Sequence, residues 1–219
     1  SIHYSNFSIN NILFPLLIFK MCGIFGYFNF SDNKLSIKQR KTILNNFIQT
    51  QHRGPEHTVF KNITDNFIIG FHRLRIVDVA HGVQPFHNED ETVFCVCNGE
   101  IYNHEELRER HKLKTKTQND CEVIYSLYMK YGSDCELDKL IAELDGVYSF
   151  CIVDIREDIP IIITARDSFG VRSLYYAINC DTKEMYIASE LKSIHEHMHD
   201  DTINFPAGHY SVNGDIKKK

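Results

Sequence analysis

The sequence lacks three features that would each point to a particular class of protein. It has no long run of one charge, and its 219 residues carry a formal net charge of -5, which argues against a nucleic-acid-binding protein. Its seven cysteines include no C-x-x-C pair, and an odd number of scattered cysteines is typical of reduced thiols in the cytoplasm. It has no apolar segment close to the roughly 20 residues that a membrane-spanning helix needs. We therefore expect a cytoplasmic protein with no nucleic-acid or membrane partner.

The first 20 residues differ from the remainder of the chain. Their apolar stretch, from Ile12 to Phe19, is interrupted by Pro15, and Lys20 follows it. A signal peptide would place its basic residue before the apolar part. We expect residues 1–21 to be an upstream extension or a removable pro-segment that ends with an initiator Met21, and to lie outside the fold. Residues 22–219 then form one domain.

The pattern after Cys22 mixes helices with closely spaced strands. Apolar residues recur at helical spacing in 37–48 and 123–131, and 137–144 reads as a shorter helix. Strand-like runs cover 22–30, 66–77, 92–101, 146–155, 160–167, 173–178 and 184–190. Short connections favour antiparallel pairing, and continuous apolar runs favour sheets that are covered on both faces. The pattern predicts an α+β fold in which two antiparallel sheets pack together with helices outside.

Cys22 follows the first methionine of the chain directly. If Met21 is removed, one residue carries both a thiol nucleophile and an α-amine whose pKa of about 7.7 to 8.0 suits a general base near neutral pH. An upstream peptide would turn this amine into an amide without useful basicity. On residue type alone, buried filler is the commoner role of a cysteine, so the hypothesis needs other groups.

Asn98 and Gly99 follow an apolar strand in the segment "NGEIYNH". A side-chain amide beside an unhindered backbone N–H could hold the oxyanion of a tetrahedral intermediate. The same Asn-Gly pair is also a strong signal for a hairpin turn. Glu100 comes next and would lie at the mouth of the same pocket.

Arg73 and Asp120 are candidates for holding an α-amino acid. Arg73 follows an apolar strand and could bind a carboxylate through two parallel hydrogen bonds. Asp120, with or without Glu100, could bind the α-amino group, although its position before a helix also suits a helix N-cap.

The chain resembles the glutaminase half of glutamine-hydrolysing asparagine synthetases, which is a class II glutamine amidotransferase domain of the N-terminal-nucleophile hydrolase type. The resemblance runs from Met21 to about Tyr210. It rests on an ordered set of motifs: "MCGIFGYF", "HRGPE", "GFHRLRIVD", "GVQPFHN", "CNGEIYNH", "NDCEVIYSLY", "LDGVYSFCIVD", "ARDSFGVRSLYYA", "ASELKSI" and "FPAGHY". It departs from the family at Glu56, where an Asp is usual.

The resemblance implies a four-layer αββα fold and hydrolysis of the glutamine side-chain amide through a cysteinyl thioester, with amide transfer to aspartate. It assigns catalytic roles to Cys22, Asn98 and Gly99. It assigns glutamine binding to Arg73, Glu100, Asp120 and the backbone of Ile76 and Val77.

The family's second half is not found in this sequence. That half carries an S-G-G-x-D-S phosphate loop, and no such run occurs here. We therefore expect no cofactor and no metal in this domain, with ATP and Mg confined to a synthetase domain in cis or in trans.

Histidines offer two alternatives. His52, His72 and His104 flank the motifs and could form a Cys–His pair, which an N-terminal amine makes unnecessary. His195 and His199 lie one helical turn apart, as metal ligands often do, although a solvated helix end is the commoner meaning of such a cluster.

Two other functions remain open at the level of sequence. The domain could serve a different ammonia acceptor, such as an amino sugar or a purine precursor. It could also be a catalytically silent binding module in which Cys22 stays inside the chain.

Overall fold

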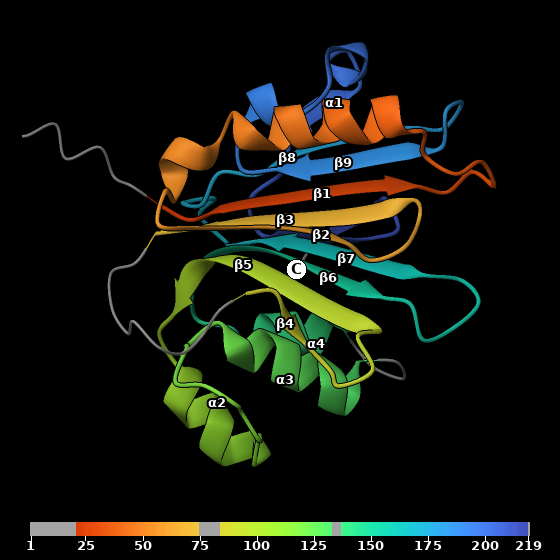
Figure 1. The fold of residues 1–219 in the computed structure, drawn as a ribbon. Helices are drawn as coiled ribbons and strands as arrows, with labels where there is room; N and C mark the ends of the chain where they lie inside the picture. Colours follow the sequence, from red (N-terminus) through yellow and green to blue (C-terminus); the bar gives the residue numbers. More distant parts are fainter. Residues whose placement is uncertain (1–20, 75–83, 133–136, 219) are drawn as a thin grey trace, which may run out of the picture.

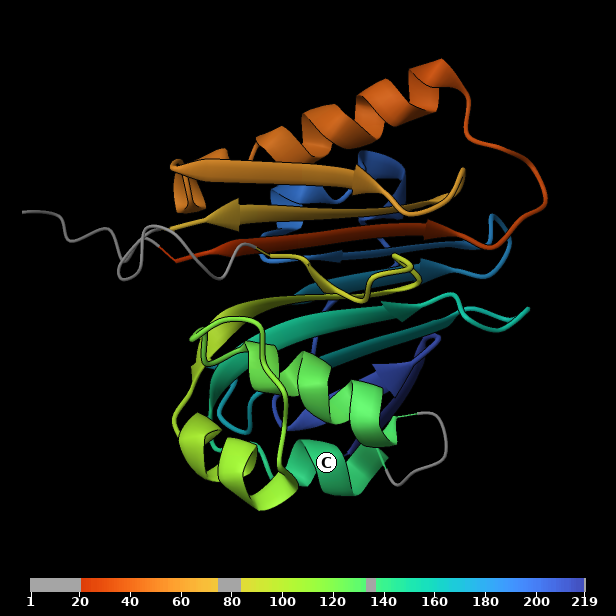
Figure 2. The same cartoon turned by 60° about the horizontal axis from the view of Figure 1, so that its bottom comes forward.

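Two antiparallel sheets lie face to face between layers of helix (Figures 1 and 2). The computed structural model describes residues 21–74, 84–132 and 137–218. In this part of the chain each sheet has six strands. The predicted α+β fold with two packed antiparallel sheets is confirmed.

The first sheet, sheet A, holds the strand that begins beside Cys22. Its strand order is β10 (Thr202–Asn204), β8 (Tyr175–Asn179), β9 (Glu184–Ala188), β1 (Gly23–Asn29), β3 (Phe67–Arg73) and β2 (His57–Asn62). β1 therefore pairs on both sides, with β3 and with β9. All seven of its residues are buried, which makes β1 a central strand and fixes the position of its first residue.

The second sheet, sheet B, holds the strand that ends at Ile101. Its strand order is β12 (Asp215–Lys218), β11 (His209–Val212), β7 (Ile161–Arg166), β6 (Gly146–Asp154), β5 (Val93–Ile101) and β4 (Phe86–His87). β5 pairs with β6 along its whole length, whereas the two-residue β4 covers only the beginning of its other edge. Among the described residues, the last part of β5 therefore has no neighbouring strand on that side.

Apolar side chains fill three layers. Residues from both sheets meet in the middle layer, among them Ile24, Phe71, Phe94 and Val153. The outer face of sheet A is covered by α1 (Ile37–Ile48) and by a short 3-10 helix, Glu196–Met198. The outer face of sheet B is covered by α2 (His104–His111), α3 (Glu122–Tyr131) and α4 (Leu137–Ala142). No helix in the described ranges is long and apolar enough to cross a membrane.

The local sequence explains the main helix of sheet A. Ser36 accepts a hydrogen bond from the backbone N–H of Gln39, and the side chain of Gln39 accepts one from the N–H of Ser36, which forms a capping box. One face of α1 then buries Ile43 and Phe47. Phe47 stacks on the His72 ring with centroids 3.9 Å apart.

Replacing Phe47 should destabilise this layer strongly. Phe47 is fully buried, so Phe47→Ala leaves a cavity and should lower the free energy of unfolding by about 3 to 5 kcal/mol in urea denaturation. Ile48→Ala on the same helix is the matched control, because Ile48 is 45% exposed. A similar loss in both variants would contradict the packing described here.

Candidate active site

A cavity of about 340 Å³ opens where β1 begins and where β3 and β5 end. Its lining includes five of the residues that the sequence singled out: Cys22, Arg73, Gly99, Glu100 and Asp120. Segments that lie far apart in the chain are thus brought to one edge of the sandwich. Ile76 and Val77 lie outside the described residues, so their backbone roles remain predictions.

Cys22 lies half-buried directly before β1. The backbone N–H of Leu74 donates to its Sγ at 3.4 Å, and Nε of Arg53 donates to its carbonyl oxygen at 3.1 Å. Burial raises the pKa of the Cys22 thiol, while the hydrogen bond from Leu74 and the nearby charges of Arg73 and Arg172 oppose this rise. The thiol is held in place, but it is not ionised by its surroundings alone.

Asn98 points into the space between the sheets. Side chains alternate along a strand, and Phe94 and Val96 of β5 lie in the middle layer, so Asn98 faces the same way. Cys22 packs against that layer from β1's side. The Asn98 side chain is 2% exposed, and its Nδ2 has no hydrogen-bond partner in the described part of the chain. A buried amide donor without a partner costs free energy unless a ligand accepts its hydrogen bond.

The hairpin alternative for Asn98 and Gly99 is wrong. Both residues lie within β5, where they pair with Ser149 and Tyr148 of β6. A Cβ at position 99 would lie 2.5 Å from the carbonyl oxygen of Val147, so the close approach of β6 requires a glycine here.

The N-cap alternative for Asp120 is also wrong. The N-cap of α3 is Cys121, whose side chain makes no capping hydrogen bond. Asp120 instead accepts a hydrogen bond from the backbone N–H of Ile101 at 2.6 Å. Its carboxylate therefore fastens the end of β5 and at the same time lines the cavity, together with Arg73 and Glu100.

The structure gives no support to a Cys–His pair. His52 contacts Glu190, with Nε2 3.1 Å from Oε1. His72 contacts the carbonyl oxygen of Phe47 through Nε2, and burial lowers its pKa. Within the described residues, the hydrogen bonds of the Cys22 thiol go to the backbone of Leu74 and to no histidine.

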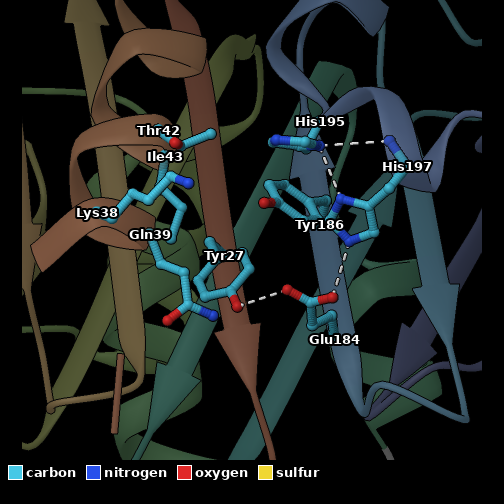
Figure 3. A pocket seen from close by; sticks show the side chains of 9 residues that line it. All are labelled: Tyr27, Lys38, Gln39, Thr42, Ile43, Glu184, Tyr186, His195 and His197. Atoms are coloured by element: carbon cyan, nitrogen blue, oxygen red, sulfur yellow. Dashed lines mark hydrogen bonds and ion pairs between the residues drawn. The ribbon is translucent and has the colours of Figure 1, made fainter. Parts of the chain in front are cut away.

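The histidine cluster near the C-terminus lies on the outer face of sheet A, beside a second cavity (Figure 3). His197 contacts Glu184 through Nε2 at 2.8 Å and His195 through Nδ1 at 2.7 Å. His199 instead contacts the carbonyl oxygen of Ile194. His195 and His199 therefore have different partners, and no group of three or more potential metal ligands was found among the described residues.

Some cavity residues were not predicted as site residues from the sequence. Gln84, Asn119 and Arg172 line the cavity, although each lies within one of the motifs quoted above. Their positions in those motifs were a usable signal, but nothing in the local sequence shows that they face Cys22.

Comparison with known proteins assigns the chain to a family. The family model of the glutamine amidotransferase domain matches residues 21–209. The chain belongs to the glutamine amidotransferase domain family. Asparagine synthetase [glutamine-hydrolyzing] 1 of Arabidopsis thaliana is 40% identical over 192 residues, which are 87% of this chain and 31% of the relative. A probable asparagine synthetase of Schizosaccharomyces pombe is 38% identical over 193 residues, which are 87% of this chain and 33% of the relative.

The predicted family resemblance is thus confirmed, and this amidotransferase chain spans about one third of the length of these relatives. A solved structure, the glutamine phosphoribosylpyrophosphate amidotransferase from B. subtilis complexed with ADP and GMP, has a TM-score of 0.66 at 19% identity. The match covers 90% of this chain and 49% of the B. subtilis chain. At this sequence identity the likeness shows the fold alone.

The raised pKa of the half-buried Cys22 thiol can be tested by alkylation. Only the thiolate reacts with iodoacetamide, and burial raises the pKa of Cys22, so alkylation at about pH 8 should be slower in the folded chain than in urea. The rate in the folded chain should keep rising above the pH at which the unfolded chain levels off. Mass spectrometry of the peptide containing Cys22 measures both rates, and identical pH profiles would contradict the described environment.

Proposed function

We propose that this domain hydrolyses the side-chain amide of L-glutamine to glutamate and ammonia, as the glutaminase half of an asparagine synthetase-like enzyme. The observation that carries the proposal is the buried, unpartnered amide of Asn98, next to Gly99 at the cavity that Cys22 lines. Such a donor fits the negative oxygen that develops when a thiol attacks an amide, and one donor of this kind contributes about 3 kcal/mol to the transition state.

In the first step the sulfur of Cys22 attacks the side-chain carbonyl carbon of glutamine. The free α-amine of Cys22 accepts the thiol proton, and the carbonyl oxygen becomes an oxyanion that Asn98 Nδ2 and the Gly99 N–H stabilise. The amine then gives its proton to the leaving nitrogen, the C–N bond breaks, and ammonia departs. A γ-glutamyl thioester remains on Cys22.

In the second step water replaces the sulfur. The α-amine accepts a proton from the attacking water, the same two donors hold the second oxyanion, and the C–S bond breaks. The proton returns to the sulfur as glutamate leaves. In the first step the thiol is not ionised in advance, because burial raises the pKa of Cys22. The amine therefore accepts the thiol proton while the sulfur attacks glutamine.

The charged cavity residues suit the other end of glutamine. Arg73 would bind the α-carboxylate through paired hydrogen bonds, and Asp120 with Glu100 would bind the α-ammonium group. The backbone of Ile76 and Val77 would complete this subsite.

Use of the ammonia needs a second activity besides glutamine hydrolysis. The matched relatives are named as whole asparagine synthetases and are about three times as long as the matched segment. Their similarity supports aspartate as the acceptor over an amino sugar or a purine precursor. A synthetase region, in cis or in trans, would bind ATP and Mg, and the cytoplasm would supply the substrates.

The exposed α-amine is the requirement that a direct experiment can test. A chain that begins at Cys22 should form glutamate from glutamine, whereas Cys22→Ala in the same chain should not. A third chain that keeps Met21 should be inactive, because its nitrogen is an amide and cannot accept the proton. Equal activity with and without Met21 would rule out the amine as base. No activity above Cys22→Ala would favour a silent binding module.

Asp120 offers a test that separates charge from structure. Asp120→Asn keeps an oxygen that can accept from the Ile101 N–H but removes the negative charge. It should therefore lower kcat/KM by about tenfold to a hundredfold, mainly through KM, with little loss of stability. Asp120→Ala also removes the acceptor and should lower the free energy of unfolding by about 1 to 3 kcal/mol. Unchanged kinetics in Asp120→Asn would exclude a role for this charge in binding.

A further inference from the structure

Beyond β4, the edge of β5 is open as far as residues 84–132 and the other described ranges show, and this open edge explains how one backbone donor is kept available beside Cys22. In an antiparallel strand, the N–H and C=O of alternate residues point to the same side. Val93 faces the side on which β4 lies, because its N–H donates to Asn88 Oδ1 and its carbonyl oxygen accepts from the N–H of Asn88. Cys97 and Ile101 face the same side, as their side-chain partners Gln84 and Asp120 show. Gly99 has the same parity, so its N–H also points to this open edge.

Gln84 takes the place of a missing strand residue. The register of β4 on β5, continued by two residues, sets Gln84 opposite Cys97. The side chain rather than the backbone makes the pairing: Cys97 N–H donates to Gln84 Oε1 at 2.6 Å, and Gln84 Nε2 donates to the Cys97 carbonyl oxygen at 3.0 Å. Gln84 is 4% exposed, so both bonds are sheltered from water.

Gly99 is left with an available donor. Its carbonyl oxygen accepts from Cys121 Sγ at 3.5 Å, while its N–H has no partner among the described residues. The positions on either side of it in this row, Cys97 and Ile101, are each held by a side chain. A donor between two anchored positions is preorganised, which is the property that an oxyanion hole needs.

We propose that Gln84 is a positioning residue for the oxyanion hole. This inference rests on the proposed function. Gln84 anchors Cys97, and through the strand it sets the direction of the Asn98 amide and the Gly99 N–H. A primary amide suits this role because it offers one donor and one acceptor side by side, as a strand residue does. Without it, two buried backbone groups lose their partners and the end of β5 is free to shift.

Such a shift acts on the transition state more than on substrate binding. The oxyanion exists only after attack, whereas Arg73 and Asp120 would hold the bound glutamine at its other end. Gln84→Ala should therefore lower kcat by about tenfold to a hundredfold and change KM by no more than about twofold. Gln84→Glu keeps the acceptor for Cys97 N–H but loses the donor when ionised, and should show the same split.

Asn88→Ala is the matched control. Asn88 supports the turn of the same β4–β5 hairpin at its far end, where its Oδ1 accepts from the N–H groups of Thr92 and Val93, both at 2.9 Å. Asn88→Ala should weaken the hairpin, and Asn88 is not among the residues that line the cavity. A general structural effect would reduce kcat in Asn88→Ala and Gln84→Ala alike. A positioning effect would appear in the Gln84 variants alone.

The inhibitor glutamate γ-semialdehyde gives a second measurement. Its adduct with Cys22 carries an oxyanion, so its Ki should rise in Gln84→Ala by a factor close to the fall in kcat. The proposal is overturned if kcat and Ki stay at wild-type values, if the loss appears in KM, or if Asn88→Ala matches Gln84→Ala.

Failure of the proposed function would look different. It would appear as no turnover in the parent chain that begins at Cys22. Amide hydrogen exchange would then still test the anchor, since protection of the Cys97 N–H should be lost in Gln84→Ala and kept in Asn88→Ala.

Discussion

The pairing of β1 on both sides is the constraint on which the site depends. Because β3 and β9 hold every residue from Gly23 to Asn29, the residue before the strand cannot move far from the sheet edge. The Arg53 side chain then holds the carbonyl oxygen of Cys22, and the backbone N–H of Leu74 holds its thiol. Cys22 directly precedes a strand whose seven residues are all buried, so the sheet fixes the position of its backbone.

The packing of the two sheets brings hydrogen-bond donors to the cavity that Cys22 lines. Sheet B brings the end of β5 to the same cavity, with the Asn98 amide turned toward the middle layer and the Gly99 N–H turned toward the open edge. One short stretch of strand therefore presents a side-chain donor and a backbone donor in different directions. Gln84 and Asp120 keep that stretch in place from a loop and from the start of a helix.

The elements with strong patterns were predictable. Periodicity placed α1 at its observed bounds, Ile37–Ile48, and the apolar runs matched β5, β6 and β7 to within one or two residues. The short elements β2, β4 and α2 were missed, because few residues and mixed polarity leave no clear period. β4 shows why this matters, since its brevity leaves the last part of β5 without a strand partner on that side among the described residues.

The sequence by itself determined the family, the ordered motifs and the residue types that amide hydrolysis requires. It could not decide whether Asn98–Gly99 turns or continues a strand, nor whether Asp120 caps a helix, because each residue suits both local conformations. The tertiary structure decided both: pairing with β6 keeps Asn98–Gly99 extended, and the unpaired N–H of Ile101 draws the Asp120 carboxylate to the strand. The physical reason is that backbone groups must find partners across the fold, and those partners lie tens of residues away in the chain.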